Sequence, residues 1–183
     1  GLAILNNAGL RSTHLQGANL TEAQLRSAIL NEANLDGALL VNADLTEPSF
    51  SRPRMNGTNL SNAMLENANF TSAILNGAIF KGAMLLGTSF NGATLEEADL
   101  AQVDLTRAKL NGCSLVNATL TQANLRGADL SWSSLRGANL RGATLYRTRL
   151  YWSNLSGAIL TDAVIMNARL EHVNLKHAEL SGA

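Results

Sequence analysis

Cysteine and histidine are scarce in this sequence, which contains one cysteine and three histidines among 183 residues. The single cysteine, Cys113, cannot form a disulfide within the chain. These few scattered side chains also do not supply the grouped ligands that a metal ion requires. We therefore expect no metal site and no cofactor. Cys113 occupies a small-residue position of the pattern described below, and we interpret it as a buried structural thiol.

An excess of charge of one sign is also missing, because 14 basic residues balance 14 acidic ones. A net charge of zero provides no general attraction to nucleic acid or to an anionic membrane. No apolar run approaches the roughly 20 residues that cross a bilayer, and no signal-peptide pattern opens the chain. We expect a soluble domain, cytoplasmic or periplasmic, that is tethered to a membrane only through segments absent from this chain.

Proline occurs only twice, and a strict five-residue pattern runs where linkers and loops would otherwise be found. From Leu5 to Leu180, every fifth residue is Leu, Phe, Met or Ile, and we call it the centre of its repeat. The residue two positions before a centre is usually alanine or another small residue. Because the register never slips, we expect one uninterrupted domain over residues 1–183. The pattern is already running at both ends, so we also expect the domain to be part of a longer protein.

A period of five fits neither a continuous helix nor a straight strand. Residues five apart on an α-helix are rotated by about 140° from one another, which would scatter the centres around the axis. On a straight strand an odd period sends successive centres to opposite faces. The chain must therefore turn within every repeat. We expect the Ala-x-Leu triplet to be extended and the two following residues to form a corner.

Glycine and several recurring side chains indicate the geometry of the corner. Of 15 glycines, 13 lie two residues after a centre, where a type II turn requires positive φ. Phe50, Phe70 and Phe90 are spaced by 20 residues, and so are Trp132 and Trp152. This longer period favours corners of about 90°, four of which close one coil.

Several triplets are literal copies of a known motif, among them residues 18–20, 43–45, 98–100 and 128–130, which read Ala-Asn-Leu or Ala-Asp-Leu. The chain resembles the pentapeptide-repeat family, whose motif is A-(D/N)-L-x-x, over its whole length. The resemblance implies an all-β fold, a right-handed quadrilateral parallel β-helix. With 20 residues per coil, the chain would make about nine coils.

The C-terminal third differs from the rest in surface composition, because residues 121–183 hold half of the basic residues, both tryptophans and both tyrosines. With the 20-residue period, Trp132, Trp152 and His172 share one outward corner. Exposed aromatic rings beside arginines suit cation–π contacts, protein docking or base stacking. The candidate partner-binding residues are Trp132, Arg147, Arg149, Tyr151, Trp152, Arg169 and His172. The alternative is that the indoles only cover one another and the arginine stems.

No constellation of catalytic residues emerges from the sequence. The acidic group Glu96, Glu97, Asp99 and Asp104 is interpreted as a solvated face, and we expect neither an enzyme nor a small-molecule substrate. Outward apolar residues such as Met64, Met84 and Leu86 form a second, modest candidate contact surface.

The leading hypothesis is a rigid, non-catalytic scaffold that presents side-chain columns to an unidentified protein partner or spaces other domains. The family resemblance adds an association with cyanobacterial repeat domains, some membrane-associated, that assemble the envelope or a glycolipid layer. Two alternatives stay open. One is mimicry of DNA towards gyrase, as in quinolone resistance, although the resemblance implies an acidic rod for that role. The other is nucleic-acid binding through the basic, aromatic C-terminal third, which we favour less than a protein partner.

Overall fold

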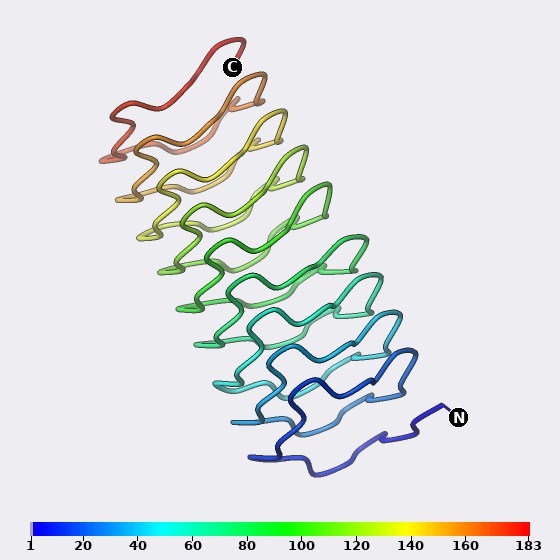
Figure 1. Ribbon diagram of the computed structural model, residues 1–183. Coiled ribbons are helices and arrows are strands. Elements are labelled where there is room, and N and C mark those ends of the chain that lie inside the picture. Colours follow the sequence, from blue (N-terminus) through cyan, green and yellow to red (C-terminus); the bar gives the residue numbers. More distant parts are fainter. Residues whose placement is uncertain (1) are drawn as a thin grey trace.

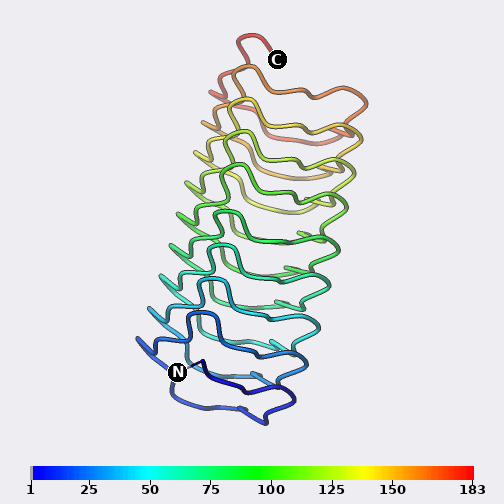
Figure 2. The same cartoon turned by 90° about the vertical axis from the view of Figure 1, so that its right-hand side faces the viewer.

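The computed structural model describes residues 2–183 as an elongated stack of coils, each lying on the one before it. The two ends of the chain lie at opposite ends of the stack (Figure 1). A view turned by 90° shows the same regular layering along the whole length (Figure 2). Within residues 2–183 there is no α-helix and no continuous strand. The backbone pairing consists of isolated parallel bridges.

Every bridge joins a residue to the one 20 positions later, from Ile4↔Gln24 to Ile159↔Glu179. The predicted 20-residue coil and its parallel pairing are therefore confirmed. The bridging residue is always the middle residue of the Ala-x-Leu triplet. Because the chain turns after each triplet, each side of a coil has room for one bridging residue rather than a conventional strand.

The backbone hydrogen bonds explain why the motif carries Asn or Asp. Around one repeat, Leu25 N–H donates to the Asp44 carbonyl at 2.8 Å, and Ala28 N–H closes the corner on the Leu25 carbonyl at 3.0 Å. The first corner residue has no such backbone partner. Where the bridging residue is Asn or Asp, its side chain fills this role, as Asp44 Oδ1 does for Thr46 N–H at 3.1 Å. All 12 Asn and Asp residues at bridging positions make this contact.

The second corner residue has positive φ in every repeat from Asn7 to Gly182. With the hydrogen bond that closes the corner, this matches the predicted type II turn. The 13 glycines expected there are joined by 23 residues of other types, including Trp132 and Trp152 with φ of 62° and 56°. Side chains other than glycine are accepted because they point away from the coil, while the hydrogen bonds between coils hold the backbone in this conformation.

The centres form a continuous core along the axis. Every centre from Leu20 to Leu160 is at most 6% exposed. Phe50 and Phe70 stack with ring centroids 4.7 Å apart, and Phe90 continues the column at 5.3 Å. Ala residues line the rest of the interior because a larger side chain would meet the centres.

Cys113 takes one of these inward positions and is 2% exposed, as predicted. Its Sγ donates to the Phe90 carbonyl at 2.8 Å, and burial raises the pKa of the thiol to about 12. The thiol is therefore protonated at neutral pH, and it acts as a small core residue with one hydrogen bond.

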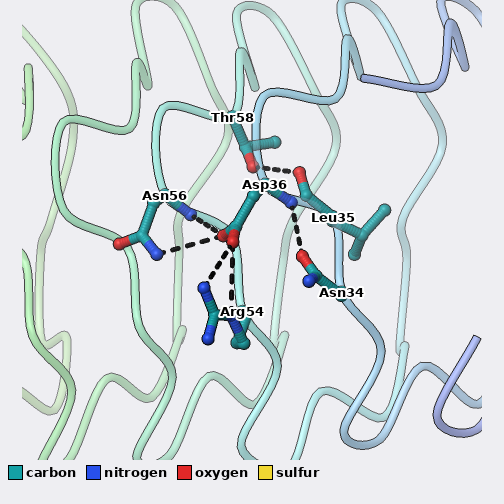
Figure 3. A network of polar contacts seen from close by, with 6 residues as sticks. All are labelled: Asn34, Leu35, Asp36, Arg54, Asn56 and Thr58. Atoms are coloured by element: carbon teal, nitrogen blue, oxygen red, sulfur yellow. Dashed lines mark hydrogen bonds and ion pairs between the residues drawn. The ribbon is translucent and has the colours of Figure 1, made fainter. Parts of the chain in front are cut away.

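Side chains also join neighbouring coils on the outside, as Figure 3 shows around Asp36. Its Oδ1 accepts Asn56 N–H at 2.8 Å, and its Oδ2 accepts Arg54 Nη2 at 2.8 Å. Inside the corner, the Thr58 hydroxyl donates to the Leu35 carbonyl at 2.8 Å. Partial burial opposes ionisation of Asp36, but the hydrogen bonds from Arg54 and Asn56 outweigh it and lower the pKa of Asp36.

Candidate partner-binding surface

Two tryptophans and a histidine form an exposed ladder at one corner of the stack. Trp132, Trp152 and His172 follow one another at intervals of 20 residues. The indoles of Trp132 and Trp152 are stacked with ring centroids 5.4 Å apart, and the His172 ring stacks on Trp152 at 4.0 Å. Trp132 is 63% exposed and Trp152 is 52% exposed. The stacking that the period predicted is present, and the ladder remains open to solvent.

The ladder begins at Trp132 because the preceding positions of its column are Gly92 and Gly112. Nothing lies within 4 Å of the point where a β-carbon of Gly112 would stand. Trp152 is covered on both ring faces by its neighbours, so its exposed area lies along the ring edge. Rigid aromatic area of this kind loses little conformational entropy on contact, which suits a docking surface.

Tyr151 and Arg169 form a polar pair beside the ladder. Arg169 Nη1 donates to Tyr151 Oη at 2.5 Å, and its guanidinium carbon lies 5.9 Å from the ring centroid. The hydrogen bond to Tyr151 raises the pKa of Arg169 above its ordinary value. The pair therefore holds the positive charge of Arg169 at Tyr151, the residue that precedes Trp152.

The structure separates Arg147 from the ladder, although the sequence analysis grouped them. The Arg147 guanidinium lies over Tyr146, 5.1 Å from the ring centroid, and Arg126 lies over the same ring at 4.8 Å. Residues 146–147 form the corner that precedes residues 151–152, so one whole side of the coil lies between them. That side carries Arg149, whose Nη1 is 3.6 Å from Asp129 Oδ2.

A shallow hollow connects the three arginines of the candidate set. It measures about 320 Å³ and is lined by Arg147, Arg149, Asn167 and Arg169. The seven candidates thus divide into an aromatic corner, a basic side and one arginine at the next corner. They are neighbours on one surface rather than a single cluster.

Sequence reasoning missed several basic residues that belong to the same surface. Lys109 shares the bridging column of Arg149 and Arg169, and Arg107 shares the column of Arg147. A second hollow of about 420 Å³ brings Arg107, Lys109 and Arg149 together with Asp129. Their residue numbers differ from those of Arg147, Arg149 and Arg169 by multiples of 20, which is the signal in the sequence that places them in the same columns.

The acidic group of residues 96–104 forms hydrogen bonds within the stack, two of them with backbone N–H groups. Asp99 and Asp104 accept the N–H groups of Ala101 and Thr106 at 3.0 and 2.9 Å. Glu96 accepts the Ser114 hydroxyl at 2.8 Å.

Across the described residues there is no cluster of three potential metal ligands. In the same part of the chain, no helix could cross a membrane.

Pentapeptide repeats match this chain in eight copies, which together cover residues 3–162. The chain belongs to the pentapeptide-repeat family. Pentapeptide-repeat proteins form right-handed quadrilateral β-helices, and the 20-residue parallel bridging agrees with four repeats in each coil. No curated protein sequence matches the chain significantly.

Solved pentapeptide-repeat structures resemble this chain to different extents. HetL from the cyanobacterium Nostoc sp. strain PCC 7120, involved in heterocyst differentiation regulation, is 29% identical and has a TM-score of 0.38, with 99% of this chain and 91% of HetL covered. Rfr23 from the cyanobacterium Cyanothece 51142 is also 29% identical, with a TM-score of 0.29 and coverage of 69% and 86%. QnrB1, a plasmid-mediated fluoroquinolone resistance protein, is 16% identical, with a TM-score of 0.44 and coverage of 98% and 92%.

Proposed function

We propose that this pentapeptide-repeat chain is a non-catalytic scaffold that binds a protein partner through its C-terminal aromatic corner. The observation that carries the proposal is the ladder of Trp132, Trp152 and His172. Two stacked indoles that are 63% and 52% exposed are costly to leave in water, and they provide a rigid apolar contact area.

The coil architecture supports a scaffold role. In a typical repeat four of the five backbone N–H groups donate to backbone carbonyls of the stack, so the columns of outward side chains keep fixed spacings. A partner that matches those spacings can dock without the scaffold changing shape, which lowers the entropic cost of binding. Envelope or glycolipid-layer assembly remains the biological context that the family resemblance brings to this proposal.

Exposed apolar residues at another part of the stack offer a comparison surface, in which Leu86 also borders the hollow of Arg107, Arg126 and Arg147. Met84 and Leu86 are 49% and 55% exposed and lie around a hollow of about 270 Å³ with Glu66 and Asp104. These side chains are flexible and unstacked, and carboxylates flank them. The aromatic corner is therefore the better anchor, and the Met84 side is the alternative.

The test is quantitative affinity capture from a lysate of the source organism, with three versions of the chain as bait. The Trp132→Ala, Trp152→Ala double variant should lose the partner that the wild-type chain enriches. The Met84→Ala variant, which changes a side chain outside the arginine-lined hollows, should retain it. Equal capture by all three baits would eliminate the aromatic corner as the contact, and loss only with the Met84 variant would move the contact to that side. Circular dichroism must show that both variants remain folded.

A further inference from the structure

Basic residues gather on the side of the stack next to the aromatic corner. They lie in one bridging column and at the corner before it. We call this set, which includes one acidic residue, the basic lane: Arg107, Lys109, Arg126, Asp129, Arg147, Arg149 and Arg169. The lane contains six cations and one carboxylate, although the whole chain has no net charge. Residues 105–183 hold nine of the 14 basic residues and only four of the 14 acidic ones.

The cations of the lane differ in their partners from three of the four arginines of the N-terminal half. Arg26, Arg52 and Arg54 each lie within 4.0 Å of a carboxylate, those of Asp44, Glu32 and Asp36. Among the cations of the lane, only Arg149 lies within 4.0 Å of a carboxylate of residues 2–183, with its Nη1 3.6 Å from Asp129 Oδ2. Arg126 and Arg147 lie over the Tyr146 ring instead. Apart from Arg149, and from Arg169 on which the charge of nearby Glu171 acts, the positive charge of the lane is available to an external anion.

The lane is also hollowed along its length. Three shallow hollows of about 280, 420 and 320 Å³ adjoin one another, the first two side by side and the third towards the C-terminal coils. The first two share Arg107 and Gly127, and the last two share Arg149. Gly127 contributes to this shape because it leaves the corner position between Arg107 and Arg147 without a side chain. The result is an interrupted groove with guanidinium groups on its walls.

We infer that the basic lane binds an acidic, extended segment of the partner protein. This inference rests on the proposed function, since it names the chemistry of the partner at the same surface. Arginine forks match carboxylates in bidentate geometry. From Lys109 to Arg169 the lane spans three coil steps, or about 14 Å at ~4.8 Å per step, which is the length of about four or five extended residues.

A polypeptide suits this surface better than a nucleic acid does. Single strands bind by stacking bases on open aromatic faces, but both faces of the Trp152 indole are already covered, and only the two end rings of the ladder, Trp132 and His172, keep one face each. Asp129 also stands in the middle of the lane, where it would repel a continuous phosphate backbone. In an extended acidic peptide alternate side chains point to opposite faces, so carboxylates can meet Lys109 and Arg169 while the side chain beside Asp129 points away from it.

The test uses the full chain and fluorescein-labelled deca-glutamate, followed by fluorescence anisotropy at low ionic strength. The triple variant Arg147→Gln, Arg149→Gln, Arg169→Gln should bind the peptide about tenfold more weakly than wild type, because three exposed ion pairs are lost. The matched control Arg26→Gln, Arg52→Gln, Arg54→Gln removes the same charge from the N-terminal half. It should bind the peptide as wild type does.

A second variant is expected to bind deca-glutamate more tightly, which a loss of folding could not produce. Asp129→Asn removes the lane's carboxylate and releases Arg149, while an Asn oxygen can still accept the Ser131 N–H that Asp129 Oδ1 accepts at 3.1 Å. Binding of deca-glutamate should tighten about twofold to fivefold.

Three results would overturn the inference: no binding of deca-glutamate, equal weakening by both triple variants, or tighter binding of deca-thymidylate than of deca-glutamate. The last result would assign the lane to nucleic acid. The proposed function is judged separately by the capture experiment. A partner lost with the Trp132 and Trp152 variant but retained by the arginine triple variant would keep the scaffold role and reject the acidic-segment inference.

Discussion

Replacing Ala118 with Leu should destabilise the coil stack by overfilling its interior. Ala118 is fully buried, and the residues one coil below and above it, Ala98 and Ala138, are fully buried alanines too. Its backbone cannot move aside, because its N–H donates to the Leu115 carbonyl at 3.1 Å and its carbonyl accepts Asn139 N–H at 2.9 Å. Overpacking of this kind costs about 1–3 kcal/mol. For a chain of this length, the melting temperature should fall by about 2–12 °C.

The control for Ala118→Leu is Thr119→Leu at the next residue. Thr119 is the bridging residue, it points outward, and its side chain makes no hydrogen bond within residues 2–183. The same larger side chain should therefore change stability by no more than about 0.5 kcal/mol. Thermal unfolding of both variants, followed by circular dichroism in one buffer, measures the difference. Equal melting temperatures would refute the assignment of inward and outward positions.

Three further predictions concern individual side chains. Asn139→Ala should lower stability by about 0.5–2 kcal/mol, because the Arg141 N–H loses its acceptor at 3.1 Å. Asn139→Asp keeps an acceptor oxygen and should retain most of the wild-type stability. Equal stabilities of the two variants in urea unfolding would contradict this. Asp36 and Asp44 have lowered pKa values, so their ionised forms stabilise the fold at neutral pH. This contribution should be lost as the pH falls below the ordinary value of 3.8 and through the folded pKa values. The double variant Asp36→Asn, Asp44→Asn should make the free energy of unfolding depend less on pH in that range. Cys113 should react with a thiol reagent at pH 8 only after unfolding, since its pKa is about 12, and rapid stoichiometric labelling of the folded chain would show that the thiol is accessible.

The fold was predictable from the sequence because one periodicity controls both the backbone and the core. The inward position of each centre and small residue follows from the extended triplet, as at Ala128 and Leu130. The coil length followed from recurrences such as Phe50 and Phe70, which stack in the structure. Composition could not show that corners tolerate Trp132 at positive φ, because that tolerance comes from hydrogen bonds between coils.

The candidate surface was predictable only in part. Stacking of Trp132 on Trp152 follows from the period alone, since identical columns lie one coil apart. Arg147 and Arg149 line one hollow, but Arg147 lies over Tyr146 at the corner that precedes the corner of the ladder, and closeness in sequence alone did not show this. Pairing is harder still to predict. Whether an arginine meets a carboxylate depends on which residues lie 18 to 21 positions away, as for Arg26 with Asp44 and Arg141 with Asp162.

The identical spacing of all bridges has a consequence for how such a chain can change over generations. An in-frame duplication or loss of 20 codons inserts or removes one complete coil and leaves every other column aligned. A change of five codons also preserves the core, but it turns everything beyond it by a quarter of a coil. Placed between Trp132 and Trp152, such a change would move Trp152 and His172 to a different corner from that of Trp132. Selection for a continuous surface column therefore restricts insertions and deletions to multiples of 20 residues, whereas selection for folding alone permits multiples of five.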